Sequence, residues 1–423
     1  MNTLFVSALL PPSPEKDVFG YALRANVVLE AAASLGDLDL LYYVYPNVDL
    51  TPEGIKVWEE HFSSRYKVNV RVTLCPLETP WQFVSAQGIA GLLWQCLRSI
   101  SFTPLFELIS MRSGGDRQID TLSQRLADNP DLLVVQNIPA AVPLLHQAGK
   151  LPPVVFDLDG IEHLKYEQQN DYEANWKKRF FNRLIIPSVK RCERETARLA
   201  MRTLLCSVDE RDSLRDLWGL PGIVCVPNAL EKRRALEVYD APSLLFIGIY
   251  EYWPNRDAVN YLLREIWPQV RAAVPDARVV IAGPFSEHIE SYREAIDGVE
   301  FTGFVDDLEA LYVRSRVVTC PLRAGSGTRL KILEAASYAK PLVSTSLGAF
   351  GIDLRDQKEI LIRDTPDAFA QACIELLRDD ERCKLLGGAA KRRVDEYYDR
   401  GVIVEQMKGH LVSAIEESAG QTD

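Results

Sequence analysis

The sequence has few residues of the kinds that mark secreted, metal-binding or membrane-spanning chains. Its 423 residues include eight cysteines and five histidines, and the cysteines form no C-x-x-C pair and no cluster with histidine. Reduced thiols in a cytoplasmic protein are therefore expected. We expect no signal peptide, because the first seven residues lack a basic region. No uninterrupted apolar run is long enough to cross a membrane.

An excess of positive charge is also absent. The formal net charge is −11, which argues against a general nucleic-acid-binding protein. The sequence has no repeats and no low-complexity segment. With 47% hydrophobic and 25% charged residues, the composition is that of a soluble globular protein. Its length predicts two or three domains rather than one.

The most informative stretch is Pro321–Ala335, PLRAGSGTRLKILEA. A short apolar run at residues 316–320 has the length of a strand, and a largely apolar helix start follows the glycines. The turn between them contains Gly325, Ser326, Gly327 and Thr328, and the threonine could cap the helix. A strand that passes through a glycine turn into a helix directs free N–H groups and the positive end of the helix dipole at the turn. This arrangement favours an anion.

Three charged side chains refine that interpretation. Arg329 and Lys331 stand in the first turn, where the dipole alone prefers acids, so we expect them to serve a ligand such as a diphosphate. Glu334 could accept hydrogen bonds from a pair of sugar hydroxyls. The alternative is an ordinary connection between a strand and a helix of an α/β sheet.

The same stretch resembles the C-terminal signature of the retaining glycosyltransferases of family 4, in the variant Gly-x-Gly-Thr-Arg-x-Lys-x-x-Glu-Ala. The resemblance implies an α/β fold of GT-B architecture, with two doubly wound, Rossmann-like domains facing a central cleft. It also implies hexosyl transfer from a nucleotide-diphosphate sugar to an acceptor hydroxyl, with retention and without a metal or other cofactor. Arg329 and Lys331 would then be catalytic residues that stabilise the leaving diphosphate.

The order of elements predicts three parts of the chain. Apolar runs at residues 3–8 and 39–44 flank a helical pattern, which is the opening of a doubly wound sheet. We expect an acceptor-binding domain at 1–230 and a nucleotide-sugar-binding domain at 241–400. A terminal helix at 401–423 is expected to return to the first domain, as the resemblance implies.

Candidate residues of the first domain follow its predicted strands. Gly20 matches by position a family glycine near the donor diphosphate, although a turn glycine explains it equally well. Asp157 and Asp159 form an Asp-x-Asp pair, which could hold a metal, but two carboxylates are too few for a hard cation. Many relatives have a histidine near this strand end, where this chain has Asp159, with His163 four residues later. One of Asp159, Glu162 and His163 is expected to hold the sugar or acceptor, and Asp159 and His163 are the candidate catalytic residues of this domain. The alternative for His163 is an exposed residue at a helix start.

The resemblance also assigns donor-binding residues in the second domain. Gly248 ends a predicted strand, and relatives usually follow it with an arginine and, about six residues later, a lysine on the diphosphate. This chain has Ile249 and Asn255 there, so Arg256 is expected to contribute the charge. Backbone groups around Val305 would read the nucleobase. Ser326 replaces a glutamate that contacts the donor sugar in many relatives.

The expected partners are a nucleotide-sugar donor and a sugar, lipid-linked or small-molecule acceptor, with no nucleic acid. The aromatic and apolar segment 88–117 could make a peripheral contact at the inner face of the membrane, or could instead cover an acceptor groove. Two other functions remain open. They are a nucleotide-sugar epimerase of the same fold and a non-catalytic nucleotide-sugar-binding partner.

Overall fold

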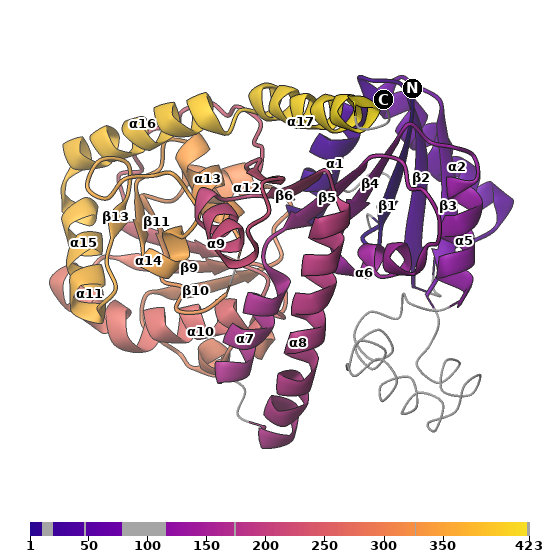
Figure 1. Cartoon of the computed structure of the whole chain (residues 1–423). Coiled ribbons are helices and arrows are strands. Elements are labelled where there is room, and N and C mark those ends of the chain that lie inside the picture. The colour runs from indigo at the N-terminus through magenta and orange to yellow at the C-terminus, as the bar shows by residue number, and fades with distance from the viewer. Residues whose placement is uncertain (11–19, 46–47, 78–115, 173–174, 326, 421–423) are drawn as a thin grey trace. The chain divides into compact units, whose positions relative to one another are not determined.

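The chain divides into two compact units (Figure 1). The computed structural model describes residues 1–10, 20–45, 48–77, 116–172, 175–325 and 327–420. Unit 1 consists of Met1–Ala229 and Gly401–Asp423, and unit 2 of Leu230–Arg400. Almost all of the predicted lipid-contacting segment 88–117 lies outside the described residues.

Unit 1 is built on a parallel sheet with the strand order β3-β2-β1-β4-β5-β6-β7. Its strands are almost continuously apolar, as parallel strands covered on both faces must be. The strands are β1 (Asn2–Ser7), β2 (Asp37–Val44), β3 (Val70–Pro76), β4 (Leu132–Gln136), β5 (Val154–Asp159), β6 (Arg202–Leu205) and β7 (Ile223–Cys225). The chain order reverses between β1 and β4, and ligands of such sheets bind beyond the carboxyl ends of the strands near this switch point.

Helices cover both faces of the unit 1 sheet and form a separate apolar core on each. One core contains side chains of α1 (Gly20–Ala33), α2 (Pro52–Tyr66) and α17 (Arg400–Gly420). The other contains side chains of α5 (Asp116–Leu126), α6 (Asn137–Ala141), α8 (Trp176–Leu199) and α9 (Val208–Trp218). The helix α7 (Glu162–Tyr172) packs against α8. The last helix of the chain is therefore part of the core of unit 1, and Figure 1 shows it lying beside the N-terminal strands.

Unit 2 has a parallel sheet of the same kind, in the order β10-β9-β8-β11-β12-β13. The strands are β8 (Ser243–Ile247), β9 (Arg278–Ala282), β10 (Val299–Gly303), β11 (Val317–Cys320), β12 (Leu342–Ser344) and β13 (Leu361–Ile362). The helices are α10 (Trp253–Tyr261), α11 (Trp267–Ala273), α12 (Leu308–Val313), α13 (Leu330–Ser337), α14 (Ser346–Ala349), α15 (Pro366–Arg378) and α16 (Asp380–Tyr397). Here the switch point lies between β8 and β11, so the turn that follows each of these strands flanks it.

The α/β prediction with two doubly wound sheets is confirmed. No helix among the described residues is long and apolar enough to span a membrane.

Because α17 fills the core of unit 1, Leu411→Ala should destabilise that unit. Leu411 is fully buried, and leucine-to-alanine changes in cores cost about 2–5 kcal/mol. Thermal and denaturant unfolding measure this loss. The matched control is Val402→Ala on the same helix, where the side chain is 51% exposed, and its free energy of unfolding should change little. Equal effects of the two substitutions would contradict the packing of α17.

Candidate functional site

The glycine turn after β11 lies at the switch point of unit 2. Gly325 and Gly327 have φ angles of 109° and 73°, which side chains other than glycine rarely adopt. α13 begins at Leu330, and Arg329 occupies the N-cap position without any side-chain hydrogen bond to the helix. The N-cap position is therefore Arg329 and not Thr328, the residue expected to cap the helix. Ser326 lies outside the described residues. The Arg329 side chain thus does not cap the first turn of α13, whose N–H groups lie beside the glycine turn, where an anion site requires them.

Arg329 is buried and folds back on the turn that precedes it. Its Nη2 donates to the carbonyl of Gly325 at 2.8 Å, and its Nη1 donates to the carbonyl of Gly327. These bonds hold the two left-handed glycines in place. The sequence pattern predicted a positive charge at this position, but it did not show that the guanidinium also closes the turn.

Lys331 comes from the same helix and is largely enclosed. Its Nζ donates to Asn255 Oδ1 at 3.0 Å and lies 4.2 Å from the centre of the Phe246 ring. No carboxylate of the described residues pairs with it. Burial lowers the pKa of Lys331 to about 8, against a weaker opposing effect of Cys320, and the nearby Arg329 lowers it further. A buried ammonium without a counter-ion is an electrostatic deficit that an anion can correct.

Asn255 connects Lys331 to the loop after β8. Its Nδ2 donates to the Ile249 carbonyl at 2.9 Å while its Oδ1 accepts from Lys331. A Cβ atom on Gly248 would lie only 2.9 Å from Asn255 Cγ, so this contact requires glycine at 248. Arg256 donates from Nη1 to the carbonyls of Tyr250 and Glu251, both at 2.9 Å. In this position Arg256 holds the loop together.

Glu334 lies one turn further along α13 and is partly enclosed. Its Oε2 accepts from the buried Tyr312 hydroxyl at 3.0 Å, and Oε1 has no hydrogen-bond partner among the described residues. Burial raises the pKa of Glu334, and the hydrogen bond from Tyr312 acts against this. One carboxylate oxygen is thus fixed inside the fold and the other remains able to accept from a ligand.

The loops after β9 and β10 reach the same edge of the sheet. Val305 is partly buried just beyond β10, and its backbone groups form no backbone hydrogen bonds with other described residues. Three exposed aromatic residues, Tyr252, Phe285 and Phe304, follow β8, β9 and β10. Phe285 has a φ of 64° and stacks on His288. These aromatics were not singled out from the sequence, although each lies no more than five residues after the end of its strand.

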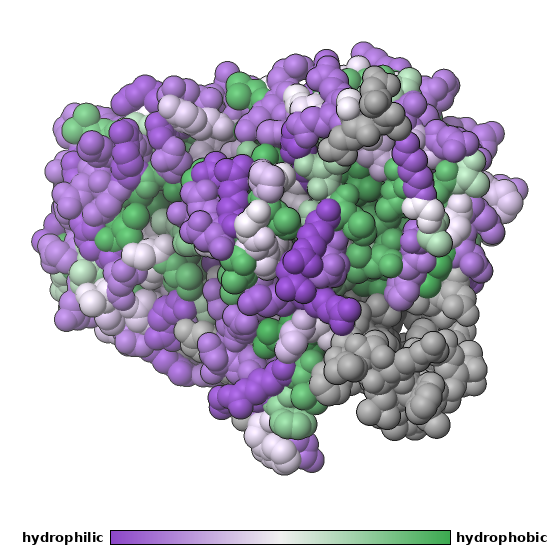
Figure 2. All heavy atoms as spheres, in the orientation of Figure 1, coloured by the Kyte–Doolittle hydropathy of each residue, from purple (hydrophilic) through white to green (hydrophobic). Residues whose placement is uncertain are grey.

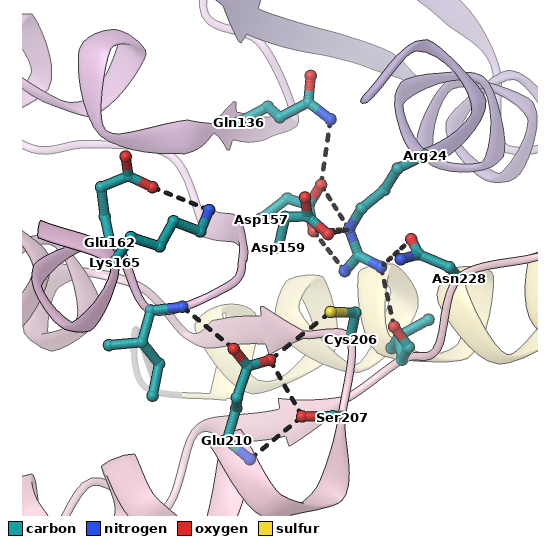
Figure 3. A network of polar contacts seen from close by, with 12 residues as sticks. Arg24, Gln136, Asp157, Asp159, Glu162, Lys165, Cys206, Ser207, Glu210 and Asn228 are labelled. Carbon is teal, nitrogen blue, oxygen red and sulfur yellow. Dashed lines mark hydrogen bonds and ion pairs between the residues drawn. The ribbon is translucent and has the colours of Figure 1, made fainter. Parts of the chain in front are cut away.

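In unit 1 the carboxyl ends of the strands meet around a buried ion pair (Figure 3). Arg24 lies on α1, four residues after Gly20, the first residue of that helix. Its Nη2 and Nε contact Asp157 Oδ1 at 2.6 and 2.8 Å, and its Nη1 donates to the Val226 carbonyl at 2.9 Å. Burial opposes the charge on Arg24, but Asp157 and Asp159 outweigh it and raise the pKa of Arg24. Sequence reasoning missed Arg24, because its partners are more than 130 residues away.

Asp157 has no oxygen left for a metal in this arrangement. It is fully buried, and Gln136 Nε2 donates to its Oδ2 at 3.2 Å, beside the bonds from Arg24. Burial raises the pKa of Asp157, and the Arg24 ion pair acts in the opposite direction. In the described parts of the chain, no group of three or more His, Cys, Asp or Glu side chains could hold a metal ion.

Asp159 presents the exposed carboxylate of this edge. Its side chain is 43% exposed, and Oδ1 lies 3.6 Å from Arg24 Nε. Its φ is 64°, a conformation that is costly for a residue with a side chain and that clusters at functional sites. Glu162 accepts from Lys165 Nζ at 2.9 Å at the start of α7 nearby.

His163 lies inside the fold. Its side chain is 2% exposed, and its Nδ1 is bonded to the fully buried Glu193 of α8. Glu193 also accepts from the backbone N–H groups of Glu162 and His163, at 2.6 and 3.2 Å. These bonds fix the start of α7. The imidazole of His163 is not exposed, so it offers no support for the predicted catalytic role. The alternative, an exposed histidine at a helix start, is wrong.

The structure therefore assembles the predicted residues into two separate groups. In unit 2 the turn at 325–331, Gly248, Asn255 and Arg256 are directly connected, with Glu334 on the same helix and Val305 at the same sheet edge. In unit 1 Asp159 contacts Arg24 of α1, the helix that starts at Gly20, whereas His163 is held by Glu193.

Comparisons with solved structures place the fold. Sucrose-phosphate synthase from Thermosynechococcus elongatus aligns with a TM-score of 0.69 and 15% sequence identity, covering 99% of this chain and all of that one. The Anabaena protein HepE, solved in complex with UDP and glucose, aligns with a TM-score of 0.64 and 13% identity, covering 98% of this chain and all of that one. The chain thus has the GT-B fold with two Rossmann-like domains.

Sequence comparisons add a family for part of the chain. Residues 241–379 match the family model described as glycosyl transferases group 1. An uncharacterised 44.6 kDa protein in the cps region of Klebsiella pneumoniae is 25% identical over 207 residues. That match covers 47% of this chain and 53% of the Klebsiella protein, so the chain spans about half the length of this curated relative. The glycine turn, Lys331 and Glu334 all lie within the matched family domain.

The buried position of Lys331 predicts a pH-dependent affinity for nucleoside diphosphates. The pKa of Lys331 is about 8, so below this pH its side chain is charged in the free protein. Above this pH, Lys331 must take up a proton when an anion binds, so the affinity for the anion should fall by up to about tenfold per pH unit. Calorimetry from about pH 7 to about pH 10, in buffers of different ionisation enthalpy, measures affinity and proton uptake.

Two variants control for this measurement. Lys331→Ala should weaken binding by about 1.5–3 kcal/mol and remove the pH dependence. Lys331→Arg retains a charge at all these pH values, so its affinity should not change with pH. A pH-independent affinity of the unaltered protein would contradict a role for Lys331 at the diphosphate.

The free oxygen of Glu334 predicts a role toward the ribose. Glu334→Gln should weaken the binding of a nucleoside diphosphate by about 1.5–3 kcal/mol and leave pyrophosphate binding unchanged, because pyrophosphate has no ribose. Calorimetry with both ligands tests this. Tyr312→Phe is the control, since it removes only the internal hydrogen bond and should lower stability by about 1 kcal/mol. Full nucleotide affinity in Glu334→Gln would rule out the assignment.

Proposed function

We propose that the protein is a retaining hexosyltransferase of the family 4 type, which uses a nucleoside diphosphate sugar and needs no metal ion. The observation on which this rests is the largely enclosed ammonium of Lys331 at the switch point of unit 2, to which the described residues offer no carboxylate. A diphosphate supplies the missing negative charge. The group 1 glycosyl transferase match over residues 241–379 supports the same conclusion.

In this proposal the donor binds at the carboxyl edge of the unit 2 sheet. The diphosphate accepts from Lys331 and from N–H groups of the glycine turn, whose shape Arg329 maintains. Glu334 Oε1 accepts from the ribose, and the backbone of Val305 reads the base. Because neighbours of this fold were solved with UDP and UDP-glucose, uridine nucleotides are the first donors to test.

The chemistry requires one bond to break and one to form at the anomeric carbon. The bond from the anomeric carbon to the diphosphate oxygen breaks, and negative charge grows on the diphosphate, where Lys331 and the turn stabilise it. The acceptor oxygen attacks from the same face, and its proton passes to the leaving phosphate oxygen. The products are the glycosylated acceptor, with retained configuration, and a nucleoside diphosphate.

Unit 1 supplies the acceptor side in this proposal. Asp159 is exposed at the carboxyl edge of its sheet, and its Oδ1 lies 3.6 Å from Arg24 Nε. A carboxylate there accepts hydrogen bonds from the hydroxyls of a sugar.

The proposal predicts release of a nucleoside diphosphate from one member of a panel of nucleotide-sugars, tested with candidate glycan acceptors and excess chelator. Lys331→Ala should lower the rate at least about tenfold, whereas Lys384→Ala, on the exposed side of α16, should not. Asp159→Asn should raise KM for the acceptor, because asparagine tolerates the left-handed backbone but lacks the charge.

Each alternative has its own result. NMR of the product sugar reports the anomeric configuration, and inversion would contradict the retaining mechanism. Formation of an epimer without diphosphate release would identify a nucleotide-sugar epimerase. Tight binding with neither product would identify a non-catalytic partner. Activity that chelator abolishes and manganese restores would contradict metal independence.

A further inference from the structure

The N-terminal end of α8 has an unusual surface for a soluble helix. Trp176 and Phe180 are 71% and 61% exposed. They are four residues apart, so they lie on the same face of the helix, one turn from each other. Figure 1 shows this end of α8 projecting away from the sheet of unit 1, and Figure 2 shows apolar colouring at the same end.

Basic residues continue along the exposed face. Arg183 and Arg191 are exposed at spacings of seven and fifteen residues from Trp176, and Ile185, Val189 and Cys192 occupy the buried face. Between Trp176 and Cys192 the helix has six basic residues and no acidic one. Within the described chain, no carboxylate pairs with Arg179, Arg183 or Arg191. In the sequence, Glu173 precedes this stretch and Glu193 follows it, and α7, which packs against α8, contains Glu167 and Asp171.

This pattern contrasts with the rest of the chain. The whole protein has a net charge of −11, whereas α8 alone has eight basic and two acidic residues. One of the acidic residues, Glu193, is buried against His163. A solvated helix face would not need exposed tryptophan and phenylalanine, and a face that binds a neutral partner would not need the guanidinium groups. Aromatic residues beside a row of Lys and Arg match an anionic lipid surface, which offers negative headgroups above an apolar layer.

We propose that the Trp176–Arg191 face of α8 is a docking surface for an anionic membrane. Trp176 and Phe180 enter the headgroup region, and Arg183 and Arg191 contact the phosphates. This surface is different from the segment 88–117 considered above. It also does not depend on the proposed function, because membrane binding is measured without any donor.

Vesicle flotation of the full-length protein tests this surface. At low ionic strength the protein should float with vesicles that contain phosphatidylglycerol and not with phosphatidylcholine alone, and salt should weaken the binding. The double variant Trp176→Ser/Phe180→Ser should lower the bound fraction by about tenfold or more, and Arg183→Glu/Arg191→Glu should do the same. The matched control is Leu385→Ser, which alters an exposed apolar residue of α16 and should bind like the unaltered protein.

A conservative variant locates the contact. Trp176→Phe should keep the binding but lose the quenching of tryptophan fluorescence by bromine-labelled lipid, because the ring that enters the headgroups no longer fluoresces. Failure of the unaltered protein to bind anionic vesicles would overturn the proposal. Binding that survives both double variants would also overturn it. A dimer in solution that dissociates in Trp176→Ser/Phe180→Ser would assign the surface to a second copy of the chain instead.

Discussion

The candidate site of unit 2 depends on one largely enclosed charge, the ammonium of Lys331, for which the described residues provide no carboxylate partner. Moving this ammonium out of water costs free energy, and among the described residues only Asn255 and the face of Phe246 compensate for it. The surrounding structure is arranged to keep this charge at the switch point of the sheet. Asn255 ties it to the loop after β8, and Arg329 fixes the turn beside it. In the proposed function, a bound diphosphate would supply the negative charge that the ammonium of Lys331 lacks.

In unit 1, by contrast, the buried charges are neutralised within the protein. Arg24 and Asp157 neutralise each other, and Gln136 and the Val226 carbonyl satisfy their remaining groups. Such a closed pair attracts no further ion and serves to position its neighbours. Asp159, at the edge of the pair, is left exposed and in a strained backbone conformation. The two units thus use the same sheet topology for different tasks. Unit 2 keeps an open cation for an anion, and unit 1 presents a carboxylate suited to hydroxyl groups.

What the sequence could predict follows from the range of the interactions involved. The parallel sheets, the glycine turn and helices such as α15 and α16 were predictable, because hydrophobic periodicity and glycine act locally. The direction of the long polar side chains was not. Arg329 turns back on its own loop, His163 turns inward to Glu193 thirty residues away, and Arg24 meets partners more than 130 residues away.

The helix α7 joins the acceptor edge of unit 1 to the surface at the end of α8. It begins three residues after Asp159 and has 11 residues, so it spans roughly 16 Å along its axis. Glu193 fixes its start, and its packing against α8 continues toward the exposed end that presents Trp176 and Phe180. The net charge of −11 opposes an anionic membrane, so attachment through this end alone would be local, reversible and sensitive to salt. A lipid-linked acceptor would then have to carry its glycan about the length of α7, roughly 16 Å, from this end of α8 to reach Asp159.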